Sequence, residues 1–471
     1  MVCLETDLHD GQMMEVDIGR HSVLLTRCDG KYSAISNQCS HYGAPLSKGV
    51  ISGHKVRCPW HGSCFNALTG DLEEFPGIDS LPCHKVQTGR YASLSIDVKN
   101  KRFVLQRMGA AVPGVNHTVL LLGGGAASLI CAETLRQENY GGRIIMASRD
   151  DLLPYDKTRL SKVMNVLSGD TIVLRKKEFF QQYNIEVWLQ KEALSVDTEK
   201  KTVTFDDGLV QSYDQLLLST GCRAKGLDVP GRKLDNIKML ETPEDARQIH
   251  AASLGCNIVK EVVLKSGNVI PADVLIVGIG SMPNSEFLQG TKIQKNSKNY
   301  VVVDKYMRTN VPDVFCAGDL ASFPLALAKN QLVNIGHWQM AQAQGRIAAL
   351  NMLKKTTELT SVPYYWTVLQ GRTIRYAGYG EGYTEIVMKG NYEFEERKFL
   401  ALYIKNDEVI AAVGLDYDPV VSAVAERLLS GKVITKKEAQ YANSQIAQSY
   451  FHSGWLSQNV LIKCFKLLKY H

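Results

Sequence analysis

The sequence predicts a multidomain protein, in which a small all-β module precedes a doubly wound α/β domain and a C-terminal α+β segment. The length is the first observation behind this prediction, because 471 residues correspond to about three domains at roughly 100 to 200 residues each. The second is a change in the hydrophobic pattern. Short strand-like runs between Gly, Asp and Pro turns give way to an alternation of strand, Gly turn and helix, and strand-like runs return near the end.

Composition places the chain among globular proteins, with 45% hydrophobic and 22% charged residues. The net charge of +6 is spread without a long basic run, so we expect no nucleic-acid partner. The longest apolar stretch, 118–132, is shorter than the ~20 residues that cross a bilayer, so we expect no transmembrane helix. The 11 scattered cysteines suit a reducing compartment, and the start of the chain shows no targeting pattern. We therefore expect a cytoplasmic protein.

Two pairs of metal-ligating residue types lie in the first module. One segment contains Cys39 and His41, and a second contains Cys58 and His61. Two thiolates and two imidazoles suit a [2Fe–2S] cluster in which the cysteines bind one iron and the histidines bind the other. The same four side chains also suit a structural zinc ion, or ordinary packing.

The residues around these ligands resemble the two cluster loops of Rieske iron–sulfur domains. The first loop reads His-Tyr-Gly-Ala-Pro-Leu over 41–46, and the second reads Cys-Pro-Trp-His-Gly-Ser-Cys-Phe over 58–65. The resemblance implies a [2Fe–2S] cluster held by the four residues named above. The remaining histidines form no pair with a nearby carboxylate of the kind that a mononuclear oxygenase iron requires, so we expect an electron relay.

Some positions differ from those of respiratory-type Rieske domains, and the resemblance implies what each difference changes. Ala44 and Trp60 stand where those domains carry an extra cysteine in each loop, so we expect no disulfide between the loops. Ser63 keeps the hydroxyl that donates a hydrogen bond to a cluster sulfur in those domains. Phe65 replaces the tyrosine that donates a hydrogen bond to the sulfur of a cysteine ligand. A lost hydrogen bond to sulfur lowers the reduction potential, so we expect the lower part of the roughly −150 to +300 mV range.

A glycine turn between a strand and a helix opens the second domain. Residues 118–122 form an apolar strand pattern, Gly123 to Gly125 form the turn, and residues 126–139 have a helical pattern. This is the context of a dinucleotide-binding fingerprint. Its third position is Ser128, which is small enough to keep helix and strand close. Asp150 follows the next strand pattern and is the candidate ligand of the ribose.

Later segments resemble motifs of the ferredoxin reductase and apoptosis-inducing factor flavoproteins. Residues 153–162 resemble a flavin-contact segment, although Lys157 stands where arginine is usual. Residues 218–221 resemble the turn beside the adenine dinucleotide, and residues 309–319 resemble the motif whose Asp bonds the ribityl chain. Two tryptophans resemble aromatic residues near the flavin ring. The resemblance implies an FAD site formed by Gly123, Gly125, Ser128, Asp150, Lys157, Lys162, Thr220, Gly221, Gly318, Asp319, Trp338 and Trp366.

A Rieske module ahead of such a flavoprotein is the arrangement of the apoptosis-inducing factor 3 (AIF-like) family, which the chain resembles over about residues 10–436. The resemblance implies an oxidoreductase that passes electrons from NAD(P)H through FAD to the [2Fe–2S] cluster and an unknown acceptor. No cysteine pair has the spacing of a redox dithiol, so the cluster is the expected recipient of electrons. The same resemblance makes the mitochondrion the alternative compartment. No catalytic residue and no oligomeric state are assigned.

Most of the second dinucleotide fold of that family, which binds NADH, is missing. Residues 256–259 begin like its first strand, but residues 260–280 resemble its closing hairpin and last strand, without a glycine fingerprint between them. One βαβ unit needs about 30 residues, so this segment cannot form the NADH fold. The alternative function is therefore a non-catalytic, apoptosis-related or regulatory variant that binds cofactors but uses NADH inefficiently.

These motifs give the expected domain boundaries. They are a Rieske domain (1–106), a linker (107–116), the first part of the FAD-binding domain (117–255), the remnant of the NADH-binding domain (256–300), the second part of the FAD-binding domain (301–355), a C-terminal α+β domain (356–437) and an atypical tail (438–471). Residues 460–471 have the pattern of a basic amphipathic helix, which is either a frayed or docked terminal helix or a membrane-surface element.

Overall fold

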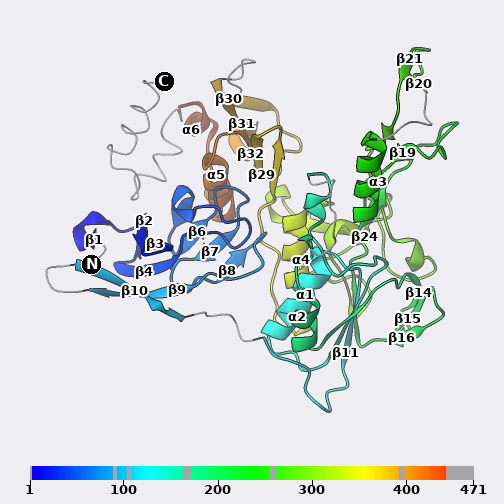
Figure 1. Cartoon of the computed structure of the whole chain (residues 1–471), viewed down its shortest axis with the longest axis horizontal. Helices are drawn as coiled ribbons and strands as arrows, with labels where there is room; N and C mark the ends of the chain where they lie inside the picture. Colours follow the sequence, from blue (N-terminus) through cyan, green and yellow to red (C-terminus); the bar gives the residue numbers. More distant parts are fainter. Residues whose placement is uncertain are drawn as a thin grey trace. The chain divides into compact units, whose positions relative to one another are not determined.

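The computed structural model describes residues 3–88, 93–102, 108–162, 171–254, 261–391 and 398–441 (Figure 1). The chain forms two compact units. Unit 1 contains residues 1–107, 326–330 and 360–471, and unit 2 contains residues 108–325 and 331–359. No helix among the described residues is long and apolar enough to cross a membrane.

The N-terminal part of unit 1 is built from two antiparallel sheets. The first has the strand order β1-β10-β9-β4-β3-β2, with β1 Cys3–Leu4, β2 Gln12–Ile18, β3 His21–Cys28, β4 Lys31–Ser36, β9 Cys83–Thr88 and β10 Ser93–Arg102. The second has the order β5-β6-β7-β8, with β5 Val50–Ser52, β6 Lys55–Arg57, β7 Cys64–Asn66 and β8 Leu72–Glu74. The expected all-β module is confirmed.

Strand β3 is apolar on both faces because each face meets a separate core. Leu24 packs with Ile35 and Phe65 in one cluster, whereas Val23 and Leu25 pack in another. Successive side chains of a strand point to opposite faces. Because both faces of β3 are covered by a core, the strand can be apolar at three consecutive positions, Val-Leu-Leu.

The C-terminal part of unit 1 is a five-stranded antiparallel sheet with helices. The strand order is β28-β29-β32-β31-β30, with β28 Tyr364–Leu369, β29 Arg372–Gly378, β30 Glu385–Asn391, β31 Lys398–Lys405 and β32 Glu408–Leu415. Helices α5, Val420–Leu429, and α6, Lys436–Tyr441, follow. Helix α5 buries Val421 and Val424 in the core of this sheet, each stabilising it by roughly 1.5 to 3 kcal/mol. In Figure 1, α5 lies beside β6 of the N-terminal module.

Unit 2 contains a five-stranded parallel sheet of doubly wound type. Its order is β13-β12-β11-β17-β25, with β11 Thr118–Leu122, β12 Arg143–Ala147, β13 Ile185–Trp188, β17 Gln215–Leu218 and β25 Val314–Cys316. Its helices are α1 Ala126–Gln137, α2 Lys177–Gln182, α3 Pro243–Leu254 and α4 Trp338–Met352. Helices α1 and α4 pack so closely that a Cβ added at Gly345 would lie 2.2 Å from the carbonyl oxygen of Ala127. The expected α/β class is confirmed.

Register brings three strand ends of this sheet to one edge. Leu122 pairs with Leu218, and Leu218 pairs with Cys316, so β11, β17 and β25 end level with one another. Ligands of open α/β sheets bind outside the carboxyl ends of the strands, and the loops that follow these three strands therefore meet at such an edge.

Smaller sheets complete unit 2. They are β14-β15-β16, with β14 Ala193–Asp197, β15 Thr202–Phe205 and β16 Val210–Ser212; β24-β26-β27, with β24 Val301–Val302, β26 Ala321–Leu325 and β27 Gln331–Val333; and the pairs β18 Cys222–Ala224 with β23 Ser281–Pro283, β19 Ile237–Lys238 with β22 Leu275–Ile276, and β20 Glu261–Val263 with β21 Val269–Pro271.

Residues 261–283, here called the shortened segment, contain only the short strands β20 to β23 and no βαβ unit. Val263 is 63% exposed and Ile276 is 55% exposed, so its apolar side chains are poorly covered. Residues 284–300, which the sequence also assigns to the remnant, belong to unit 2 as well, and Leu288 is buried there. Residues 255–260 and 442–471, which include Val259, Lys260 and the amphipathic pattern of the tail, lie outside the described residues.

Candidate iron–sulfur and flavin sites

Two tight loops of unit 1 present the four predicted metal ligands. Cys39 and His41 lie between β4 and β5, and Cys58 and His61 lie in the hairpin between β6 and β7. Each loop closes on its own cysteine, because the Cys39 N–H donates to the Ala44 carbonyl at 2.9 Å and the Cys58 N–H donates to the Ser63 carbonyl at 2.8 Å.

The two histidine nitrogens lie together, and so do the two cysteine sulfurs. His41 Nδ1 lies 3.0 Å from His61 Nδ1, and the thiols of Cys39 and Cys58 are hydrogen-bond partners. Among the described residues, no group of three or more His, Cys, Asp or Glu side chains is arranged to hold one metal ion. A tetrahedral zinc site needs four ligands around one point, whereas a Rieske cluster needs two nitrogens on one iron and two sulfurs on the other. The residues therefore fit a [2Fe–2S] cluster.

The surroundings favour the iron-binding protonation states of His61 and Cys39, whereas burial raises the pKa of the Cys58 thiol. Burial, together with the nearby His41 and Arg375, lowers the pKa of His61 to about 2, so its imidazole is neutral. The Cys39 sulfur accepts hydrogen bonds from the backbone N–H groups of His41 and Tyr42, which favour the thiolate.

The positions that distinguish this module from respiratory-type domains are also visible. The Ser63 hydroxyl bonds Cys39 and accepts a hydrogen bond of 2.9 Å from the Gly77 N–H. Phe65 and Ala44 are buried, and the cysteines that the structure describes are all free thiols. The low potential expected from Phe65 stays a prediction.

Trp366 lies against the cluster ligands of unit 1. Its assignment to the flavin ring, which rests on the resemblance, stays a prediction. Its ring centroid is 5.0 Å from that of His61 and 5.8 Å from that of His41. Strand β28 starts two residues earlier and carries the tryptophan to this position.

A cavity of about 1020 Å³ in unit 2 collects most of the predicted flavin residues. It is lined by Gly123, Gly125, Asp150, Lys157, Thr220, Gly221, Gly318, Asp319 and Trp338, among others. The loops that follow β11, β17 and β25 each contribute. The volume lies at the upper end of the 300 to 1,000 Å³ that is typical of cofactor sites.

The glycine turn leaves room for a phosphate. Gly123 has φ +122°, and a Cβ there would lie 2.2 Å from the Ser219 carbonyl oxygen, so only glycine fits. A Cβ at Gly125 would meet nothing within 4 Å, and no side chain caps the N-terminus of α1 behind it. The backbone N–H groups at this helix end can therefore receive a pyrophosphate.

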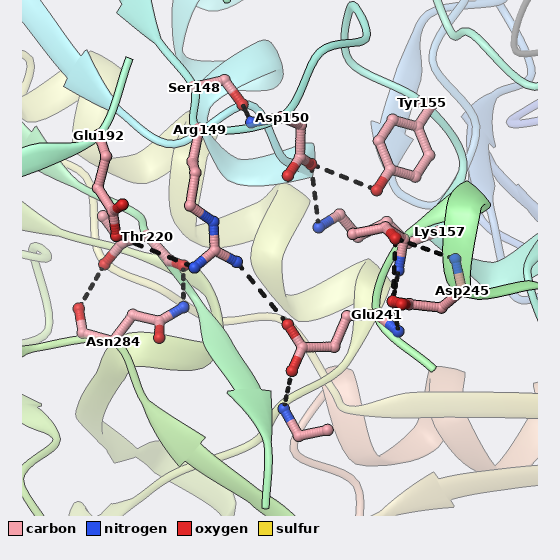
Figure 2. Close-up of polar contacts among 12 residues, drawn as sticks. Ser148, Arg149, Asp150, Tyr155, Lys157, Glu192, Thr220, Glu241, Asp245 and Asn284 are labelled. Atoms are coloured by element: carbon pink, nitrogen blue, oxygen red, sulfur yellow. Dashed lines mark hydrogen bonds and ion pairs between the residues drawn. The ribbon is translucent and has the colours of Figure 1, made fainter. Parts of the chain in front are cut away.

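Charged side chains surround the part of the cavity that we predict for the ribose (Figure 2). Asp150 accepts a hydrogen bond of 3.3 Å from Tyr155 and pairs with Lys157 at 3.5 Å. Arg149 pairs with Glu241 at 3.8 Å and with Glu192 at 4.0 Å. The sequence alone does not predict Arg149, Glu241 or Glu192 as site residues.

Buried polar groups shape the opposite part of the cavity. Burial raises the pKa of Asp319, and the nearby Lys157 partly opposes this shift. The Gly318 N–H donates to the buried Gln344 side chain of α4 at 2.7 Å, which fixes the Gly-Asp turn against this helix.

The chain after the shortened segment closes this cavity. Thr220 Oγ1 donates to the Asn284 carbonyl at 2.7 Å, and Asn284 Nδ2 donates to the Thr220 carbonyl at 3.0 Å (Figure 2). Strands β18 and β23 pair immediately beside this contact. The first dinucleotide fold is therefore continuous across the deletion, and its residues fit FAD.

Besides Trp366, two predicted flavin residues do not line the cavity. Ser128 is fully buried, and its hydroxyl lies 2.6 Å from that of Ser219, so it joins α1 to the end of β17. Lys162 is exposed at the end of the flavin-contact segment. Ser128 thus serves the close packing of helix and sheet, because it is too deep to reach a ligand.

The paired ligands of unit 1 and the cavity of unit 2 belong to one class of protein, the oxidoreductases that combine a flavin with an iron–sulfur cluster. Residues 1–85 match the family model of the Rieske [2Fe-2S] domain, and residues 117–259 and 251–345 match that of the pyridine nucleotide-disulphide oxidoreductases. These families imply a [2Fe–2S] cluster, FAD and NAD(P)H. Apoptosis-inducing factor 3 from Homo sapiens and that from Mus musculus are each 40% identical over 93% of this chain and 85% of the relative. The chain belongs to the apoptosis-inducing factor 3 family.

More distant comparisons agree on the reductase fold. The ferredoxin–NAD(+) reductase component of the biphenyl dioxygenase system of Paraburkholderia xenovorans is 25% identical over 68% of this chain and 95% of its own length. A ferredoxin reductase from Rhodopseudomonas palustris superposes with a TM-score of 0.64 at 22% identity, covering 71% of this chain and all of its own. The latter likeness shows the fold alone.

The comparisons also bear on the shortened segment. The alignment to the human and mouse relatives spans 520 positions, more than the 471 residues of this chain, so the relatives contain residues that this chain lacks. The oxidoreductase model matches in two pieces that meet at 251–259, just before the shortened segment. Both findings support the loss of most of the NADH-binding fold.

Proposed function

We propose that this protein passes electrons from NAD(P)H through FAD to its own [2Fe–2S] cluster and then to a one-electron acceptor. The observation that carries the proposal is the cavity of unit 2, where the loops after three parallel strands meet and Asn284 closes the wall across the deletion. The ligand pairs of unit 1 supply the second redox site in the same chain.

The residues of the cavity have separable roles in this proposal. When bound, FAD would supply the chemistry that links two-electron hydride transfer to one-electron transfer. The N-terminus of α1 would hold its pyrophosphate, Asp150 the ribose and Asp319 the ribityl chain. Replacing Asp319 by Ala should weaken FAD binding while cluster content stays unchanged, because Asp319 belongs to unit 2 and the four ligands belong to unit 1.

The nicotinamide side of the reaction is the part that the shortened segment affects. Hydride transfer needs the nicotinamide about 3 to 3.5 Å from the flavin, and binding energy along the rest of the dinucleotide supplies that positioning. Gly278 and Gly280 still line the cavity, but residues 261–283 form no βαβ unit that could hold a second pyrophosphate. We therefore expect slow, poorly saturable reduction by NADH.

This poor nicotinamide site favours a second function, that of a non-catalytic or regulatory variant that holds both cofactors. Anaerobic reduction of the purified full chain separates the two functions. Photoreduction or dithionite should bleach the flavin and produce a Rieske-type EPR signal, whereas NADH should do so slowly. If photoreduced flavin passes no electron to the cluster, the regulatory function is favoured. Saturable NADH turnover at ordinary enzyme rates would show that our interpretation of the deletion is wrong.

Partner and compartment also remain proposals. The biphenyl-system relative is named as a ferredoxin–NAD(+) reductase component, which supports a small electron-transfer protein as the acceptor. For the compartment we propose the cytoplasm, with the mitochondrion as the alternative from family resemblance. Fractionation of cells that express the tagged full chain decides between them.

A further inference from the structure

We propose that the C-terminal domain helps to position the ligands of the iron–sulfur centre. In this proposal Glu426 and Ser422 are positioning residues that hold the second ligand loop, which carries Cys58 and His61. Here the C-terminal domain means the described residues 360–391 and 398–441 of unit 1. The inference rests on the proposed function, since it assumes that the loop of Cys58 and His61 binds the cluster.

The first contact passes through Arg57, the residue before Cys58. Arg57 is 2% exposed, and its Nη1 donates to the Gly62 carbonyl at 2.9 Å, so its side chain spans the two ends of the ligand loop. Glu426 of α5 accepts from Arg57 Nε at 2.8 Å, and Glu74 lies 2.8 Å from Arg57 Nη2. A buried guanidinium needs charged partners, and one of the two comes from the C-terminal domain.

The second contact reaches the ligand residue itself. Ser422 Oγ donates to the Cys58 carbonyl at 3.1 Å, and Tyr364 lies 3.0 Å from the same hydroxyl. Because a serine hydroxyl has one hydrogen, Tyr364 must be the donor to Ser422. This chain of bonds fixes the Cys58 backbone from outside the module.

The third contact is steric. Gly62 has φ +77°, and a Cβ built there would lie 2.8 Å from the ring of Tyr364. The loop therefore packs with its backbone directly on a buried aromatic ring. Trp366 of β28 also packs against the side chains of His61 and His41. Residues of β28 and α5 therefore contact the backbone of the second ligand loop, its histidine side chain and the guanidinium of the neighbouring Arg57.

The outer partners of metal ligands orient those ligands, and their loss typically costs about ten- to a hundredfold in metal affinity. We expect the Glu426→Gln and Ser422→Ala variants of the full chain to keep their flavin and their circular dichroism. Both should release iron to a chelator about tenfold faster than the parent, and both should show a shifted or broadened Rieske EPR signal. Tyr364→Phe, which keeps the ring on Gly62, should have a smaller effect.

Glu438→Gln is the matched control, because Glu438 pairs with Arg427 of α5 and with Thr435, all within the C-terminal domain. Iron release and EPR spectra in Glu426→Gln and Ser422→Ala that equal those of the control would overturn the inference. If Glu426→Gln fails to fold, which a loss of circular dichroism relative to the parent would reveal, Ser422→Ala decides alone. A parent protein without labile sulfide or a Rieske signal would overturn the proposed function as well, so the two failures are distinguishable.

Discussion

Arg57 and Val263 lie at opposite extremes of burial, and each departs from what its side chain prefers. Arg57 is charged yet 2% exposed, because two carboxylates pair with its guanidinium and the Gly62 carbonyl accepts a hydrogen bond from it. Val263 is aliphatic yet 63% exposed, in the shortened segment. A buried guanidinium with two carboxylate partners shows that the distant segments that stabilise it are in place. The exposed aliphatic strand is covered by no element among the described residues.

The largest effect should come from removing a cluster ligand. Cys58→Ser should abolish the Rieske EPR signal and the labile sulfide, because each thiolate is one of two on its iron. Cys83→Ser is the control, since Cys83 is a partly exposed thiol in the same module. Retention of a normal cluster in Cys58→Ser would contradict the assignment of the ligands.

A glycine of the intact dinucleotide fold should give the next largest effect. Gly123→Ala places a Cβ against the Ser219 carbonyl in a conformation that disfavours side chains, so unfolding free energy should fall by about 3 kcal/mol or more. Gly125→Ala meets open space and should cost about 1 kcal/mol or less in the flavin-free protein. Denaturant unfolding of the two variants checks this, and equal losses would contradict it.

His337 at the cavity should make the stability of unit 2 depend on pH. Burial lowers the pKa of His337 to about 4, below its usual value near 6.5. Its neutral form therefore contributes stability that is fully present above pH 6.5 and is lost as the pH falls toward 4. His337→Gln should flatten the stability curve over this interval. Parallel curves for parent and variant, measured by thermal unfolding, would rule out this contribution.

The smallest effect should come from the shortened segment. Val263→Thr and Ile276→Thr change side chains that are mostly exposed, so each should alter the unfolding free energy by no more than about 0.5 kcal/mol. Both should reduce binding of a hydrophobic dye. A loss of several kcal/mol would show that something covers this segment in solution, which would weaken the contrast with Arg57.

The sequence predicts the sites best where one loop carries the whole signal. The cluster ligands are near neighbours in the chain, Cys39 with His41 and Cys58 with His61, so the sequence alone predicts a metal site. The role of Gly123 in a dinucleotide-binding turn is predicted for the same reason, because a strand, a turn and a helix follow one another directly in the sequence.

What the sequence does not reveal depends on folding over long distances. Glu426 meets Arg57 across 369 positions, and no local pattern distinguishes it from an ordinary helix carboxylate. Glu192 and Glu241 reach Arg149 from separate loops and carry no motif. The resemblance identifies Trp366 as an aromatic residue of a family motif, yet only the fold shows that it contacts histidines.

The contact between Ser422 and Cys58 also has a consequence for the order of events during synthesis. Ser422 follows Cys58 by 364 positions, so a ribosome working at roughly 5 to 20 residues per second takes about 20 to 70 seconds to reach it. Throughout that interval the nascent chain contains all four cluster ligands but not α5. Cluster donors and oxidants alike meet the second ligand loop before the helix that covers it has been made.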